Sequence, residues 1–102
     1  MKQTTAAKRT PLEASGLHTE AFKALAHLTR LQVFFLLVRS GKQVSVGEIQ
    51  EALEVPAPTL SHHLDILRRA GLVRSRRQER HIFCSVNREF VVDLVWLLTA
   101  CC

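Results

Sequence analysis

Residues 45–72 read SVGEIQEALEVPAPTLSHHLDILRRAGL, and this stretch decides the fold. It begins with Ser45, followed three residues later by Glu48, which is the pattern of a capping box. In such a box the serine hydroxyl accepts from the Glu48 amide while the carboxylate reaches back to the Ser45 amide. The short helix that follows is expected to bury its apolar positions, Val46, Ile49 and Leu53.

A second helix is expected after a short turn. Residues 54–57 form the turn, Pro58 suits the first helical position, and Gly71 ends a helix over about 58–70. Because helical neighbours are about 100° apart, Leu60, Leu64 and Leu67 share one apolar face, with His63 and Ala70 at its edge. The opposite face carries Pro58, Ser61, His62, Asp65 and Arg69. Two helices joined in this way indicate a helix-turn-helix.

A basic hairpin is expected directly after the second helix. Residues 72–75 and 80–86 alternate in polarity as strands do, and the polar residues 76–79 between them form the turn. Six arginines lie within 68–80 and only Glu79 opposes them, so this segment carries the whole net charge of +5. A helix-turn-helix followed by a basic hairpin is a winged helix-turn-helix, a mainly α fold that binds DNA.

The residue types on these elements suit DNA. Thr59, Ser61 and His62, near the start of the recognition helix over 58–70, permit a close approach to base edges in the major groove. Arginine forms bidentate bonds with phosphate and guanine, so we also expect Arg69 to contact DNA. The wing over 72–86 would contact phosphates or the neighbouring minor groove through Arg76, Arg77 and Arg80.

Two helices are expected before this motif. The first covers 12–26 and is best supported from His18 onward. Thr29 caps the second, which runs to Arg39 and stops at Gly41.

A last helix is expected after the wing, over about 88–100, with Asn87 as its cap. It is apolar nearly all round and must therefore be buried on nearly all sides. One copy of a 102-residue chain cannot cover a terminal helix in this way. We therefore expect this helix to form a dimer interface.

Length and composition exclude several classes of protein. With 102 residues and 47% hydrophobic content, the chain is expected to be one globular domain over 11–102, preceded by a flexible polar arm over 1–10. The longest apolar stretch, 90–100, is shorter than the ~20 residues of a membrane span, and no secretion signal is recognised. A cytoplasmic location without membrane association is expected. Paired carboxylates, a glycine-rich phosphate loop and a nucleophile with a base are all missing, which argues against an enzyme.

Blocks of sequence resemble the ArsR-type (ArsR/SmtB) winged helix-turn-helix repressors: residues 22–31, 46–49, and 59–64 with 67–73. The similarity covers roughly 18–100 and departs at Leu28, where many members carry proline. The resemblance implies a homodimer, paired through its first and last helices, that binds a palindromic operator and releases it when an effector binds. Two-fold symmetry would place the recognition helices about 34 Å apart, one turn of DNA.

Two sensing sites of this family are missing. The cysteine-rich site on the first helix of the DNA-binding motif is absent because 45–53 contains no cysteine. The last-helix zinc site is absent because no histidine follows Asp93. Cys101 and Cys102 remain, where the resemblance places the vicinal pair of arsenic-sensing members. The third cysteine that such members often carry slightly beyond the pair is not in this sequence.

Thiol chemistry supports this pair, because trivalent arsenic and antimony are soft centres that prefer sulfur. Cys84 is either a third ligand, supplied across the dimer, or a buried core residue. Two thiolates alone would favour an organoarsenical such as methylarsenite over arsenite. We therefore expect a repressor that releases DNA when a trivalent arsenical, or antimonite, binds Cys101, Cys102 and, in the three-thiol case, Cys84. No obligatory cofactor is expected.

Two other functions stay open on the same fold. A thiol redox or polysulfide sensor would link Cys84 to a terminal cysteine, and a constitutive DNA-binding protein would respond to no effector. Histidine ligation is not favoured, because His62 and His63 point about 100° apart on a helix. His62 is assigned to DNA and His63 to a packed, hydrogen-bonded position. The remaining histidines stand alone, without a cysteine or carboxylate at ligand spacing: His18, His27 and His81.

Overall fold

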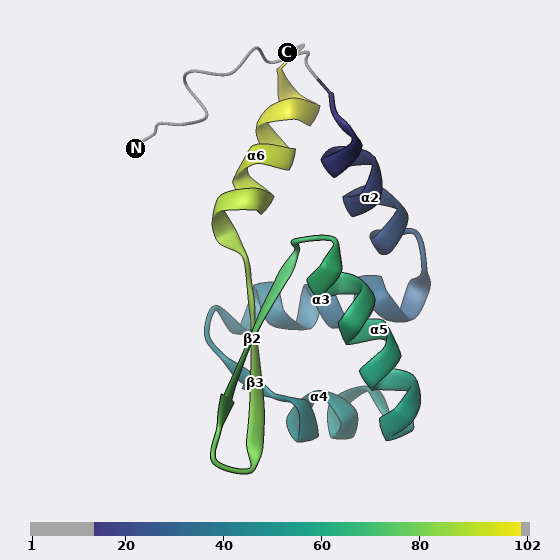
Figure 1. Ribbon diagram of the computed structural model, residues 1–102, viewed down its shortest axis with the longest axis vertical. Helices are drawn as coiled ribbons and strands as arrows, with labels where there is room; N and C mark the ends of the chain where they lie inside the picture. Colours follow the sequence, from purple (N-terminus) through teal and green to yellow (C-terminus); the bar gives the residue numbers. More distant parts are fainter. Residues whose placement is uncertain (1–13, 101–102) are drawn as a thin grey trace.

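The computed structural model describes residues 14–100. The elements in this range are, in chain order, α2 (Gly16–Leu25), α3 (Leu28–Ser40), β1 (Val44–Ser45), α4 (Val46–Leu53), α5 (Ala57–Arg69), β2 (Val73–Gln78), β3 (His81–Val86) and α6 (Arg88–Thr99). The strands form one antiparallel sheet in the order β1-β3-β2. Figure 1 shows α2 and α6 at one end of the molecule, with α4, the start of α5 and the hairpin tip at the other. The expected mainly helical fold with a small hairpin wing is confirmed.

Some predictions fall outside the described residues. These are the arm over 1–10 and the two cysteines at 101 and 102. Within residues 14–100, no single helix is long and apolar enough to cross a bilayer, and α2 and α3 reach that length and composition only as a pair bent by 99°.

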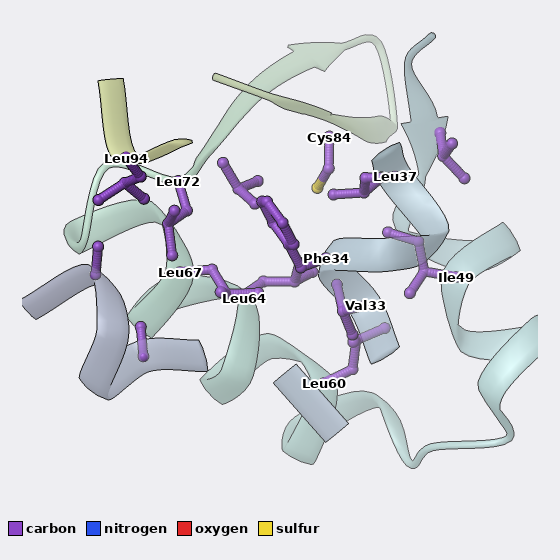
Figure 2. Close-up of a cluster of buried hydrophobic side chains, with 14 residues drawn as sticks. Val33, Phe34, Leu37, Ile49, Leu60, Leu64, Leu67, Leu72, Cys84 and Leu94 are labelled. Carbon is purple, nitrogen blue, oxygen red and sulfur yellow. The ribbon is translucent and has the colours of Figure 1, made fainter. Parts of the chain in front are cut away.

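The core holds the recognition helix α5 against α3 and the sheet. Figure 2 shows the buried side chains of these elements meeting around Phe34. Leu60, Leu64 and Leu67 are all at most 1% exposed, which confirms the inner face predicted for α5. Because burying one leucine side chain contributes about 1.5–3 kcal/mol, these three side chains fix both the position and the rotation of α5. The polar side chains on its opposite face are thereby directed outward.

The predicted end of α3 and start of α4 are confirmed. Ser45 Oγ accepts from the Glu48 amide at 3.1 Å, and Glu48 Oε1 accepts from the Ser45 amide at 2.9 Å. The bonds from the Ser45 backbone and then from its hydroxyl lower the pKa of the Glu48 carboxyl. Gly41 ends α3 in the left-handed conformation, at φ 68°, and its amide donates to the Leu37 carbonyl.

Two helix starts differ from the prediction. α2 begins at Gly16 rather than at residue 12. Ser15 is its N-cap residue, because the Ser15 amide donates to the His18 side chain instead of continuing a helix toward residue 12. α3 is capped by His27 and not by Thr29, since Nδ1 of His27 accepts from the Thr29 amide at 3.2 Å. In both helices an imidazole nitrogen does what a hydroxyl or carboxylate does in the usual capping patterns.

The hairpin turn also lies later than predicted. β2 includes residues 76–78, and the turn consists of Glu79 and Arg80, with Glu79 in the left-handed conformation at φ 57°. The prediction placed the turn at 76–79 because the outer part of β2 is exposed and polar. The two-residue strand β1, which was not predicted, pairs with the middle of β3.

Candidate nucleic-acid interface

The outward face of α5 carries the side chains predicted to contact DNA. Thr59, Ser61 and His62 are exposed, while their neighbours Leu60 and His63 are buried. The start of α5 lies at the same end of the molecule as α4 and the hairpin tip (Figure 1). α5 and the wing can therefore face one DNA duplex together, with small polar side chains on the helix and arginines on the wing.

Three of the six arginines within 68–80 are held by acidic side chains. Arg69 Nη2 lies 2.6 Å from Asp65 Oδ2, one turn earlier on α5. Arg68 lies 3.7 Å from the other oxygen of Asp65 and donates to Ser75 Oγ at 2.9 Å. Arg74 donates to Glu89 Oε1, at the start of α6, at 3.0 Å. Much of the positive charge near the end of α5 is therefore compensated within the protein.

The arginines nearer the hairpin tip are less engaged. Arg76 donates to Gln43 Oε1 at 3.2 Å and approaches Gln78 Oε1 at 3.4 Å, which are neutral partners that leave its charge uncompensated. Arg77 and Arg80 are exposed and have no hydrogen-bond or ion-pair partner within the described residues 14–100. The uncompensated positive charge is thus concentrated toward the tip of the wing, where a phosphate can approach.

His63 anchors the recognition helix to α3. Its side chain is buried, its ring centroid lies 4.7 Å from that of His27, and its Nδ1 lies 3.3 Å from Arg30 Nη1. Burial, followed by the charges of His27, Arg30 and His62, lowers the pKa of His63. The predicted packed, hydrogen-bonded role of His63 is confirmed. His27, for which no cysteine or carboxylate partner was predicted, lies against the ring of His63.

The structure also pairs a histidine for which no partner was predicted. His18 Nε2 lies 3.1 Å from Asp93 Oδ2, and both side chains are buried between α2 and α6. The prediction that His18 has no carboxylate partner is therefore wrong. The two residues are 75 positions apart, so no local spacing pattern could have indicated the contact.

The predicted thiol site is only partly visible. Cys84 is fully buried on β3, opposite Ser75 of β2 and Val44 of β1, and its Sγ lies 3.5 Å from Ser75 Oγ. Figure 2 shows this sulfur directed into the apolar cluster. Among residues 14–100 no three histidine, cysteine or acidic side chains are grouped so that they could hold a metal ion. Cys101 and Cys102 lie outside the described range, so the described residues do not bring the three thiols together.

α2 and α6 expose large apolar side chains. Val92, Val95 and Leu98 on α6 are each more than half exposed, Trp96 is 40% exposed, and Leu17 on α2 is 70% exposed. We refer to these five residues as the α2–α6 apolar face. Large apolar side chains exposed on two helices at one end of a fold are typical of a surface that contacts a partner.

The capped helix-turn-helix, the basic hairpin and the outward polar face of α5 define a winged helix-turn-helix DNA-binding protein. A family profile described as a helix-turn-helix domain matches residues 25–76. Among curated proteins, the chain is 43% identical over 79 residues to the HTH-type transcriptional regulator KmtR of Mycobacterium tuberculosis. That match covers 78% of this chain and 59% of KmtR.

Solved structures agree with this comparison. A homodimeric winged helix-turn-helix DNA-binding domain from Mycobacterium bovis, Mb0332, superimposes with a TM-score of 0.69 at 30% identity, over 82% of this chain and 76% of that one. The ArsR family transcriptional regulator RHA00566 superimposes with a TM-score of 0.70 at 26% identity, over 84% and 88%. The chain belongs to the ArsR-type winged helix-turn-helix transcriptional regulators, which are DNA-binding proteins and not enzymes.

Proposed function

We propose that this regulator is a homodimeric repressor that binds operator DNA in the cytoplasm and releases it when a trivalent arsenical binds cysteine thiolates. The observation that carries the DNA-binding part is the shared location of two exposed polar surfaces. The start of α5, where Thr59, Ser61 and His62 are exposed, and the hairpin tip, next to the uncompensated arginines, lie at the same end of the fold.

In the proposed complex α5 enters the major groove. Thr59, Ser61 and His62 would meet base edges, because they are exposed near the start of the helix. Arg76, Arg77 and Arg80 would contact phosphates or the adjacent minor groove. Arg69 is assigned a phosphate contact as well, although binding DNA would then compete with its ion pair to Asp65.

The proposed dimer is supported by the α2–α6 apolar face and by the homodimeric state of the M. bovis domain. Pairing of two copies through this face would cover side chains that one copy leaves in water. Two-fold symmetry would then present two α5 helices to successive major grooves, about 34 Å apart. The operator should accordingly be palindromic.

The proposed effector site consists of Cys101 and Cys102, which follow α6 closely in the chain. A monosubstituted trivalent arsenical exchanges its two hydroxyl groups for the sulfurs of two thiols, and each hydroxyl leaves with a thiol proton as one molecule of water. Complete burial of Cys84 in the core favours such a two-thiol site, because a third bond from Cys84 would require part of the core to open. The order of response expected is methylarsenite above arsenite and antimonite.

A binding assay on the DNA upstream of its own gene tests this function. Fluorescence anisotropy would follow the operator complex with arsenite, methylarsenite, antimonite, zinc or peroxide, in the parent and in Cys101→Ser, Cys102→Ser and Cys84→Ser. Release by methylarsenite that both terminal substitutions abolish and Cys84→Ser retains is expected. A response unchanged in both terminal variants contradicts the site. Release by peroxide alone would indicate a thiol redox sensor. If no agent releases the DNA, the protein is a constitutive DNA-binding protein.

A further inference from the structure

The imidazole of His18 contacts Asp93 of α6 through one ring nitrogen and caps the first turn of α2 through the other. His18 Nε2 lies 3.1 Å from Asp93 Oδ2, while Nδ1 of the same ring lies 3.0 Å from the Ser15 amide nitrogen. The His18 and Asp93 residues are 6% and 8% exposed. The ring of Phe90 stacks on the imidazole at a centroid distance of 6.4 Å, so α6 holds the ring from two sides.

The partners determine where the proton of this imidazole is. A backbone amide can only donate, so Nδ1 of His18 accepts from the Ser15 amide and carries no proton while this bond is made; Ser15 Oγ, 3.3 Å from the same nitrogen, can donate to it as well. In the neutral ring the proton is then on Nε2, which donates it to Asp93. The carboxylate on α6 therefore favours the one tautomer in which His18 can cap α2.

This cap differs chemically from the usual one. The third helical residue of a capping box is ordinarily glutamate or glutamine, whose oxygen accepts a hydrogen bond whatever its other contacts are. Here that position is occupied by His18. An imidazole nitrogen accepts only while the proton is on the other nitrogen, so the cap depends on what that other nitrogen meets.

We infer that Asp93 is a positioning residue for the first turn of α2, because it keeps the proton of His18 on Nε2 and so leaves Nδ1 to bind the Ser15 amide. When α6 moves away from α2, Nε2 loses the carboxylate that holds its proton, so the bond from the Ser15 amide to Nδ1 is weakened. The start of α2 is thus more stable while α6 is docked. Both helices contribute to the α2–α6 apolar face, so a displacement of α6 changes both parts of that face together.

Amide hydrogen exchange and side-chain nitrogen NMR on the full chain test this inference. In the parent we expect His18 protonated at Nε2 and a protected Ser15 amide. Asp93→Leu fills the buried position with an apolar side chain and removes the acceptor of the His18 proton. It should speed exchange of the Ser15 amide by about fivefold to tenfold, the range expected for a lost helix cap. The matched control Glu89→Gln, on the same helix, removes the negative charge that pairs with Arg74 and should leave Ser15 unchanged.

A second variant separates the cap from the contact with α6. His18→Gln supplies the ordinary capping side chain, so the Ser15 amide should stay protected both alone and combined with Asp93→Leu. Equal protection of Ser15 in the parent and in Asp93→Leu would overturn the inference. A parent protein in which His18 is protonated at Nδ1 would also overturn the inference, and this measurement does not depend on the folding of a variant. None of these measurements involves DNA or an arsenical, so they stand apart from the proposed function.

Discussion

Arg30 Nη1 on α3 lies 3.3 Å from Nδ1 of His63 on the recognition helix. A guanidinium group only donates hydrogen bonds, so the imidazole nitrogen accepts and His63 is neutral in the folded protein. The Nε nitrogen of Arg30 meanwhile donates to the Ala24 carbonyl at 2.7 Å, which fixes the guanidinium at the end of α2. The recognition helix is thereby attached to α2 and α3 through one arginine.

This contact predicts that acid destabilises the fold through His63. Burial, and then the charges of His27, Arg30 and His62, lower the pKa of His63 from its ordinary value of 6.5. The unfolded chain therefore binds a proton more readily than the folded one. The stability contributed by neutral His63 is fully present above about pH 6.5 and is lost as the pH falls through the lower folded value.

Urea unfolding between pH 7.5 and pH 5 measures this effect. His63→Gln should reduce the loss of unfolding free energy over that range, because it removes the group that must be protonated. His81→Gln, at an exposed position on β3, is the matched substitution and should change the pH dependence less. An identical pH dependence in the parent and in His63→Gln would show that His63 does not contribute.

The partners of the wing arginines predict unequal contributions to DNA binding. Arg77→Ala and Arg80→Ala remove uncompensated charges, and in the proposed dimer each would remove two phosphate contacts. Each should lower the slope of log K against log salt by about 2 and weaken binding to all sequences alike. Arg74→Ala removes a charge already paired with Glu89, so its slope should stay close to that of the parent. Titrations at several salt concentrations would reveal a ranking opposite to this one if Arg74 contacts DNA.

Local signals predicted the helix-turn-helix well. The Ser45 and Glu48 capping box, the spacing of leucines on α5 and the glycine at 41 each depend on residues within one or two helical turns of one another. Such short-range rules carry over directly from sequence to structure. The exposed polar side of α5 was predictable because it is the complement of a clearly apolar side.

Features that depend on tertiary contacts were not predictable. The hairpin turn has Glu79 in a left-handed conformation without the glycine or asparagine that usually marks it. Pairing of His18 with Asp93 joins positions 75 residues apart. His27 and His18 act as helix caps through ring nitrogens, which no common capping pattern includes. The distinction between paired and uncompensated arginines likewise needed the positions of Asp65 and Glu89.

Loss of the Ser45 cap should cost stability and leave the DNA surface intact. Ser45→Ala removes the acceptor of the Glu48 amide bond, and an N-cap of this kind contributes about 1 kcal/mol. Chemical denaturation should show that loss, with operator affinity at low temperature close to the parent value. Ser61→Ala, exposed on α5, is the converse control, with lower operator affinity and unchanged stability. Equal stability of Ser45→Ala and the parent would contradict the capping role.

The α2–α6 apolar face predicts a concentration-dependent dimer, which the tryptophan fluorescence of the protein can measure. Trp96 is the single tryptophan of the chain and is 40% exposed in one copy, so dissociation of a dimer should move its emission to longer wavelength on dilution. Val95→Glu, which introduces a charge at a half-exposed apolar position, should give a monomer at all concentrations and weaken operator binding at least tenfold. Gln78→Glu adds the same charge on the wing and should leave the sedimentation coefficient unchanged. A parent that sediments as a monomer at micromolar concentration, or a Val95→Glu variant that remains a dimer, would place the interface elsewhere.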